Sequence, residues 1–158
     1  MKKTNAARVL DRMKIAYELG EYAFDEEHLG AEHVAAEIGL PLDQVFKTLV
    51  ARGDGREVVM ACVPGSGDLD LKALAALAGF KKVEMVPLKE VQPLTGYIRG
   101  GVSPLAPKKA YRLFIDASAL SFPFISVSAG QRGLQIKVAP GDLVAATGAL
   151  VGSLVKDR

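Results

Sequence analysis

Two pairs of strand-like segments, each joined by a short turn, constrain the fold of this chain more than any other feature. FKTLVA (46–51) and EVVMACVP (57–64) flank the turn-forming sequence RGDGR, which predicts a hairpin. FPFISVS (122–128) and LQIKV (134–138) flank SAGQRG, and LQIKV alternates apolar and polar residues as a half-buried strand does. Adjacent strand pairs of this kind argue against a regular repeat of parallel strand, helix and strand.

Helical segments are interleaved with these strands. Thr4 or Asn5 can cap a first helix that ends before Gly20, and Asp70 can cap another one, LKALAALAG (71–79), which Gly79 ends. The remaining predicted helices cover 31–39, 87–94 and 141–148, and the remaining extended segments cover 17–24, 83–86, 111–116 and 151–155. The expected fold class is therefore α+β, a mixed sheet with helices packed around it.

Length and composition fit one domain over residues 1–158. A chain of this size buries about 68–70% of the surface that its unfolded form exposes, and no repeat, linker or low-complexity segment divides it. The single cysteine, Cys62, excludes an internal disulfide and favours a reduced, cytoplasmic location. No apolar run has the length of a signal peptide core or of a membrane span, so neither is expected.

The charge balance does not by itself predict a nucleic-acid partner. Lys and Arg total 20 against 18 Asp and Glu, a formal charge of only +2. The pairs Lys2-Lys3, Lys81-Lys82 and Lys108-Lys109 leave two possibilities open, a local basic patch or ordinary solvated surface charge.

The residues needed for a hydrolytic triad or a metal site are missing from the sequence pattern. The two histidines, His28 and His33, lie near neither a serine nor a cysteine elbow, and their spacing does not match that of zinc peptidases. We expect them to be surface or capping residues. Cys62 lies within an apolar strand, which favours a buried sulfur in the core over a nucleophile.

Two features remain to be explained. Lys47 places an ammonium group in the apolar segment FKTLV, where it must reach solvent, pair with an acid or face a ligand. The segment TGYIRGGVSP (95–104) contains three glycines, which suits either an awkward turn or a main chain that lies directly against a ligand.

The motifs FKTLV, LKALAALAGFKKVEM, TGYIRGGVSPLAPKK, VSAGQRGLQI and APGDL occur in the order and spacing of the YbaK family, which the chain resembles over nearly its whole length. These are free-standing deacylases related to the editing domain of bacterial prolyl-tRNA synthetases. The resemblance implies a barrel-like mixed sheet surrounded by helices. It also implies hydrolysis of mischarged tRNA, typically cysteine on tRNA(Pro), with prolyl-tRNA synthetase as a possible partner. No cofactor, metal, DNA or membrane is expected.

The resemblance also assigns roles to residues of the site. The essential lysine of the family corresponds to Lys47. The expected substrate-binding residues are Tyr22, Thr48, Gly100, Gly101, Ser103 and Ser128. Relatives usually continue SPLG where this chain has SPLA, so Ala106 is a departure from the family pattern that bears on the local shape of that loop.

In this family the substrate is expected to supply the nucleophile, because the cysteine thiol attacks its own ester carbonyl. Alternatives stay open: a deacylase for alanine or another small amino acid that uses water, a non-catalytic module that binds aminoacyl-tRNA, or a purely structural domain.

Overall fold

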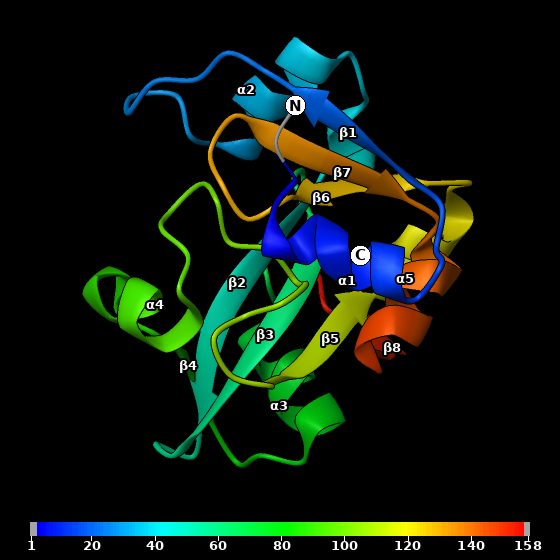
Figure 1. Cartoon of the computed structure of the whole chain (residues 1–158). Helices are drawn as coiled ribbons and strands as arrows, with labels where there is room; N and C mark the ends of the chain where they lie inside the picture. Colours follow the sequence, from blue (N-terminus) through cyan, green and yellow to red (C-terminus); the bar gives the residue numbers. More distant parts are fainter. Residues whose placement is uncertain (1–2, 157–158) are drawn as a thin grey trace.

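The structure, a computed structural model, describes residues 3–156 and has a mixed α+β fold (Figure 1). Its helices are α1 (Asn5–Arg12), α2 (Ala31–Ile38), α3 (Leu71–Ala78), α4 (Leu88–Thr95) and α5 (Pro140–Thr147), with 3-10 turns η1 (Leu42–Gln44) and η2 (Ala117–Ser121). Its strands are β1 (Tyr17–Glu21), β2 (Phe46–Gly53), β3 (Glu57–Pro64), β4 (Val83–Met85), β5 (Arg112–Asp116), β6 (Ile125–Ser128), β7 (Leu134–Val138) and β8 (Leu150–Gly152).

The larger sheet has the strand order β4-β2-β3-β5-β8. The predicted hairpin β2-β3 is confirmed, with a register that runs from Phe46 opposite Pro64 to Gly53 opposite Glu57. β5 and β8 then add in parallel, so the sheet is mixed. Along β3, Met60 and Cys62 face the main core, whereas Val59, Ala61 and Val63 pack with α3 on the opposite face. Both faces of the strand are therefore covered, as its almost continuous apolar sequence requires.

The smaller sheet has the order β1-β7-β6, with both pairs antiparallel. SAGQRG is thus the predicted turn between two strands. The main core includes, from α1 and β7, the buried residues Ala6, Ala7, Leu10, Leu134, Ile136 and Val138. α1 crosses the junction of the two sheets in Figure 1, and burying a residue such as Leu10 contributes roughly 1.5–3 kcal/mol.

The sheets do not close into a barrel within residues 3–156. They approach each other at an isolated parallel bridge between Val45 and Ser126, and each keeps its own edges. The core is nevertheless barrel-like, because residues of both sheets share one apolar cluster. This junction brings the first half of β2 close to the smaller sheet.

Helix boundaries follow the predicted caps. The Thr4 hydroxyl accepts a hydrogen bond from Ala7 N, and Asp70 accepts from Lys72 N and Ala73 N. One prediction was wrong in detail: Pro87 is the N-cap of α4 instead of its first helical residue, and the helix continues through Pro93. Within the described residues, no helix combines the length and the apolar character needed to cross a membrane.

Candidate functional site

A cavity of about 400 Å³ lies between the two sheets, beside the first half of β2. One wall is β2 itself, and the start of α2 and the start of α4 form two others. Arg99, Gly100 and Val102 of the glycine-rich loop line it, as do Ser128 and Gln135 of the smaller sheet. Five parts of the fold therefore meet at one site: β2, the starts of α2 and α4, the glycine-rich loop and the smaller sheet.

The edge of β2 explains why a cavity forms here. β4 pairs only with Ala51–Gly53, so no strand of the described chain covers this edge of β2 at Thr48. The Val45 carbonyl accepts from Gly65 N at 2.7 Å on the β3 side, and the Val50 carbonyl accepts from Val86 N at 3.0 Å on the opposite side. Because main-chain groups alternate in this way, the N–H and C=O of Thr48 point away from β3, toward the cavity side.

Lys47 is half-buried and lines the cavity. Among residues 3–156 its amine has neither a hydrogen-bond partner nor an ion-pair partner. Of the three roles that the sequence left open, pairing with an acid is thus not observed. The ammonium group is available to an oxygen of a ligand in the cavity.

The hydroxyl of Thr48 is turned toward Cys62, with Oγ1 3.3 Å from Sγ. Cys62 is fully buried, and burial raises the pKa of its thiol to about 12, while the Thr48 contact opposes this shift in part. A thiol with this pKa stays protonated at neutral pH, so it cannot act as a nucleophile. The prediction of a buried core sulfur is confirmed.

The smaller sheet contributes Ser128 and Gln135. Ser128 Oγ accepts from Gly130 N at 3.1 Å, which fixes the β6-β7 turn. Gln135 Oε1 accepts from Ser126 Oγ at 2.8 Å, and only 5% of Gln135 is exposed. Sequence reasoning missed Gln135, because its position in the alternating strand predicted a solvent-facing side chain. The alternation of apolar and polar residues does not distinguish a polar strand face that is buried in the protein from one that is exposed to solvent.

The glycine-rich loop forms a tight turn. Gly101 N donates to the Ile98 carbonyl at 2.9 Å, and Gly100 at the third position has a φ of 86°, as in a type II turn. The Arg99 carbonyl accepts from Arg132 Nε at 2.8 Å. The N–H of Gly100 is trans to that carbonyl in the same peptide plane and therefore points away from Arg132.

Gly100 and Gly101 differ in what their backbone allows. A Cβ on Gly101 would lie 3.1 Å from Gln131 Cα, so Gly101 permits close packing of two loops. Its N–H is already used within the turn. The N–H of Gly100 has no acceptor among residues 3–156, and Gly100 lines the cavity. Of the two, Gly100 supplies the available donor.

Tyr22, Gly101 and Ser103 do not line the cavity, whereas Lys47, Thr48, Gly100 and Ser128 do. Ser103 is fully buried, and its Oγ accepts from Leu105 N at 3.1 Å. Tyr22 packs with Val34 and Val45, two residues that line the cavity. Tyr22 therefore packs behind the cavity wall, whereas Ser103 stabilises the loop after Val102 through its contact with Leu105.

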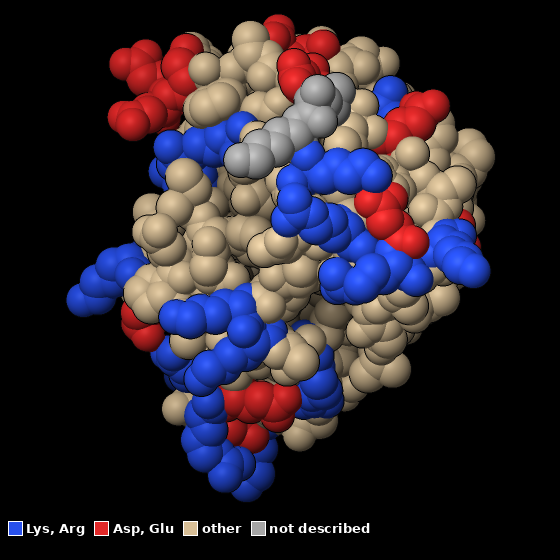
Figure 2. All heavy atoms as spheres, in the orientation of Figure 1, with Lys and Arg blue, Asp and Glu red and all other residues tan. Residues whose placement is uncertain are grey.

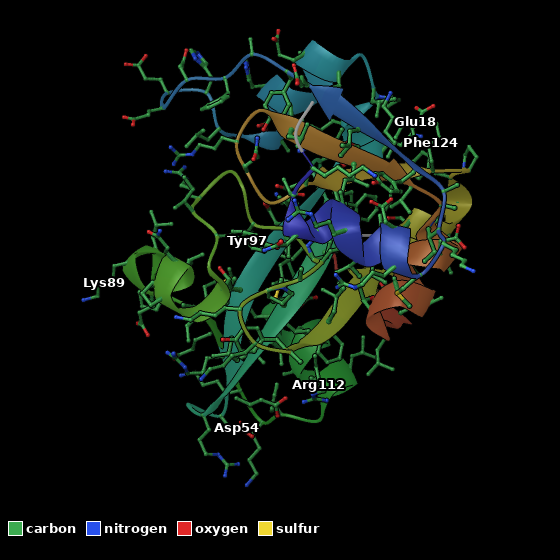
Figure 3. All side chains as sticks on the ribbon, viewed as in Figure 1. Glu18, Asp54, Lys89, Tyr97, Arg112 and Phe124 are labelled. Atoms are coloured by element: carbon green, nitrogen blue, oxygen red, sulfur yellow. The ribbon has the colours of Figure 1, made fainter. Side chains whose placement is uncertain are left out.

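Ala106 keeps the conformation that a glycine would adopt. Its φ is 52°, in the left-handed region. The hydroxyl of Tyr97, labelled in Figure 3, donates to the carbonyl oxygens of Leu105 at 2.6 Å and of Ala106 at 2.9 Å. Burial raises the pKa of Tyr97 to about 12, so it stays a donor. These contacts hold the turn in place although it lacks the usual glycine.

His28 is exposed and His33 partly exposed, in agreement with the predicted surface position, and neither lines the cavity. His28 Nδ1 is 2.7 Å from Asp25 Oδ1, which lowers the pKa of Asp25, and His33 Nε2 is 2.7 Å from the Ala23 carbonyl. No group of three or more potential metal ligands exists in the described part of the chain. Figure 2 shows acidic side chains gathered at the outer end of the loop between β1 and α2, whereas Lys and Arg are spread over the middle and lower part of this face with some acidic side chains among them.

Comparisons with known proteins test the family resemblance that the sequence motifs indicated. The sequence matches the family described as "Aminoacyl-tRNA editing domain" over residues 25–146. It is 45% identical to "Putative Cys-tRNA(Pro)/Cys-tRNA(Cys) deacylase EbsC" of Enterococcus faecalis, over 92% of this chain and 88% of the relative. It is 26% identical to a proline--tRNA ligase of Stenotrophomonas maltophilia, over 66% of this chain and 19% of the ligase. A crystal structure described as "a putative trans-editing enzyme for prolyl tRNA synthetase" has a TM-score of 0.83 and 25% sequence identity, and the match covers 99% of each chain. The family resemblance of the sequence motifs is confirmed.

Proposed function

The chain belongs to the aminoacyl-tRNA editing domain family, and on that premise we propose that it removes cysteine from mischarged tRNA(Pro) in trans. One observation carries the proposal: the Lys47 ammonium, which has no partner among residues 3–156, lines a cavity to which the described chain contributes neither a cysteine nor a histidine. The name of the Enterococcus faecalis relative favours cysteine as the amino acid. We extend the proposal to a single domain over residues 1–158 that works in the cytoplasm, where tRNA is charged.

The reaction uses the thiol of the substrate. Its sulfur bonds to the ester carbonyl carbon, the bond from that carbon to the ribose oxygen breaks, and the thiol proton passes to that ribose oxygen, which becomes a hydroxyl. The products are a cyclic thioester and uncharged tRNA. Correct positioning of two such groups lowers a barrier by about 7–11 kcal/mol, so the protein need only hold them in line.

The chain supplies two fixed partners for this step. The Gly100 N–H, which has no acceptor among residues 3–156, donates to the carbonyl oxygen of the ester as negative charge develops on it. Lys47 binds a ribose or phosphate oxygen of the tRNA end. Thr48 and Ser128 already form hydrogen bonds with protein atoms, so they shape the cavity and leave the chemistry to the substrate.

Selectivity follows from this chemistry. One methylene group changes binding to a pocket by only about 1–3 kcal/mol, whereas an alanyl ester has no thiol and cannot react by this route. The second candidate is a deacylase for alanine or another small residue that uses water. The unpaired Gly100 N–H and Lys47 would serve that reaction too, so a panel of substrates separates the two. Because the net charge is only +2, we expect prolyl-tRNA synthetase to assist in the selection of tRNA(Pro).

The test is the release of labelled cysteine from Cys-tRNA(Pro). Lys47→Ala should lower kcat/KM by about 10–100-fold, as expected for a lost hydrogen bond from a charged group worth 1.5–3 kcal/mol. Lys72→Ala on α3 is the control, since Lys72 is exposed and does not line the cavity. Release by the wild type no faster than in buffer would refute the deacylase function. Undiminished cleavage of S-methylcysteinyl-tRNA would refute the thiol mechanism alone.

A further inference from the structure

We propose that the end of the cavity beside α4, formed by Met85, Leu88 and Val91, binds the adenine base of the nucleotide that carries the amino acid. This inference rests on the proposed function and adds a second subsite to it. It assigns a role to residues that the sequence motifs did not single out.

The cavity has two ends of different chemistry. Lys47, Thr48, Ser128 and Gln135 place polar groups at one end. Val50, three residues further along β2, lies about 10 Å from Lys47, since a strand advances about 3.3 Å per residue. The Val86 N–H donates to the Val50 carbonyl, so β2 holds the start of α4 at this distance. The lining beside α4 is apolar, with Met85, Val86, Leu88 and Val91.

Two residues of this apolar end are unusually exposed. Leu88 is 60% exposed and Met85 43% exposed, although both line a cavity. Val86 and Val91 line the same end of the cavity, are 6% and 9% exposed and belong to a buried cluster. Exposed large apolar side chains beside buried ones at a cavity mouth are typical of a site that buries an apolar group of its ligand.

The cavity is too large for the amino acid alone. At about 30 Å³ per water molecule, a volume of about 400 Å³ would hold on the order of a dozen waters. A cysteinyl group has far fewer heavy atoms than that. With cysteine held near Lys47, the volume beside α4 remains for the adenosine to which it is esterified.

Charge favours a nucleotide over an apolar peptide or a lipid chain. The charged residues of the lining, Lys47 and Arg99, are both cations, and none of the described residues that line the cavity is acidic. Lys89 follows Leu88 and projects outward from α4 in Figure 3. The neighbouring acids Glu84 and Glu90 do not line the cavity and are paired with Lys82 and Arg52. An apolar surface in a cavity whose charged lining is cationic suits a ligand with a flat base and an anionic backbone, as at the 3′ end of RNA.

The experiment is a titration of methyl-labelled protein with adenosine monophosphate, followed by NMR. The Met85 and Leu88 methyl signals should shift and saturate. Leu88→Asn should weaken this binding at least 5-fold and lower kcat/KM on Cys-tRNA(Pro) to a similar extent. Leu120→Asn is the matched control, because Leu120 is 55% exposed, does not line this cavity and should change neither quantity.

The outcomes separate this inference from the proposed function. Equal shifts with inorganic phosphate alone, or unchanged binding and turnover in Leu88→Asn, would overturn the adenine subsite while deacylation by the wild type stands. Saturable shifts at Met85 and Leu88 without any release of cysteine would support a nucleotide site and refute the deacylase. Thermal melting of both variants checks that each is folded.

Discussion

Ala106 holds a left-handed conformation without being a glycine, and this makes the loop a sensitive test of the structure. At a φ of 52° its Cβ is strained by about 1–2 kcal/mol. Ala106→Gly removes that strain, but the unfolded chain gains freedom worth about 0.5–1 kcal/mol. The midpoints of the two ranges differ by about 0.75 kcal/mol, so we expect a stabilisation of about 0.5–1 kcal/mol. Because Ala106 is only partly buried, the loss of its methyl contacts reduces this stabilisation only slightly.

The assay is thermal unfolding followed by circular dichroism. For a chain of this size the stabilisation corresponds to a rise in Tm of about 1–4 °C. Ala110→Gly is the matched control: Ala110 is exposed in the same loop region and is not among the residues with positive φ. It should lose about 0.5–1 kcal/mol. If both variants are destabilised equally, the reasoning about Ala106 is wrong.

Two further predictions concern the core, and one concerns the glycine-rich loop. Gly53→Ala should cost about 1–3 kcal/mol or more in chemical denaturation, because a Cβ there would lie 2.2 Å from carbons of the Phe80 ring, and wild-type stability would contradict this packing. Cys62, with its pKa raised to about 12, should react with Ellman's reagent at pH 8 only in denaturant, whereas fast reaction of the folded protein would show that the thiol is accessible. Tyr97→Phe should lower stability by about 1–3 kcal/mol, since the carbonyl of the buried residue Leu105 loses its donor, and an unchanged Tm would argue against this hydrogen bond.

The fold class followed from local sequence signals. The β2-β3 hairpin, the β6-β7 turn and the helix caps at Thr4 and Asp70 each depend on neighbouring residues, so they could be predicted directly. The 3-10 turn Ala117–Ser121 was missed. Its cap is Asp116, which is buried and whose Oδ1 also accepts from Leu154 N, 38 residues away. A contact across that separation leaves no periodic signal.

The site was predictable only in part. The family resemblance identified Lys47 and Gly100, and the structure places both at the cavity. It did not separate Gly100, with an available N–H, from Gly101, whose N–H is used in the turn. That difference depends on the direction of individual peptide planes, which the composition of the loop does not specify.

By itself the sequence determined where strands, turns and caps form, because those preferences act between residues a few positions apart. Only the tertiary structure decided that β4 pairs with the far half of β2 and leaves Thr48 at an uncovered edge. Only the tertiary structure placed Gln135 and Leu88 at one cavity. Their positions depend on how two sheets and a helix pack, since that packing minimises the exposed apolar area of the chain as a whole.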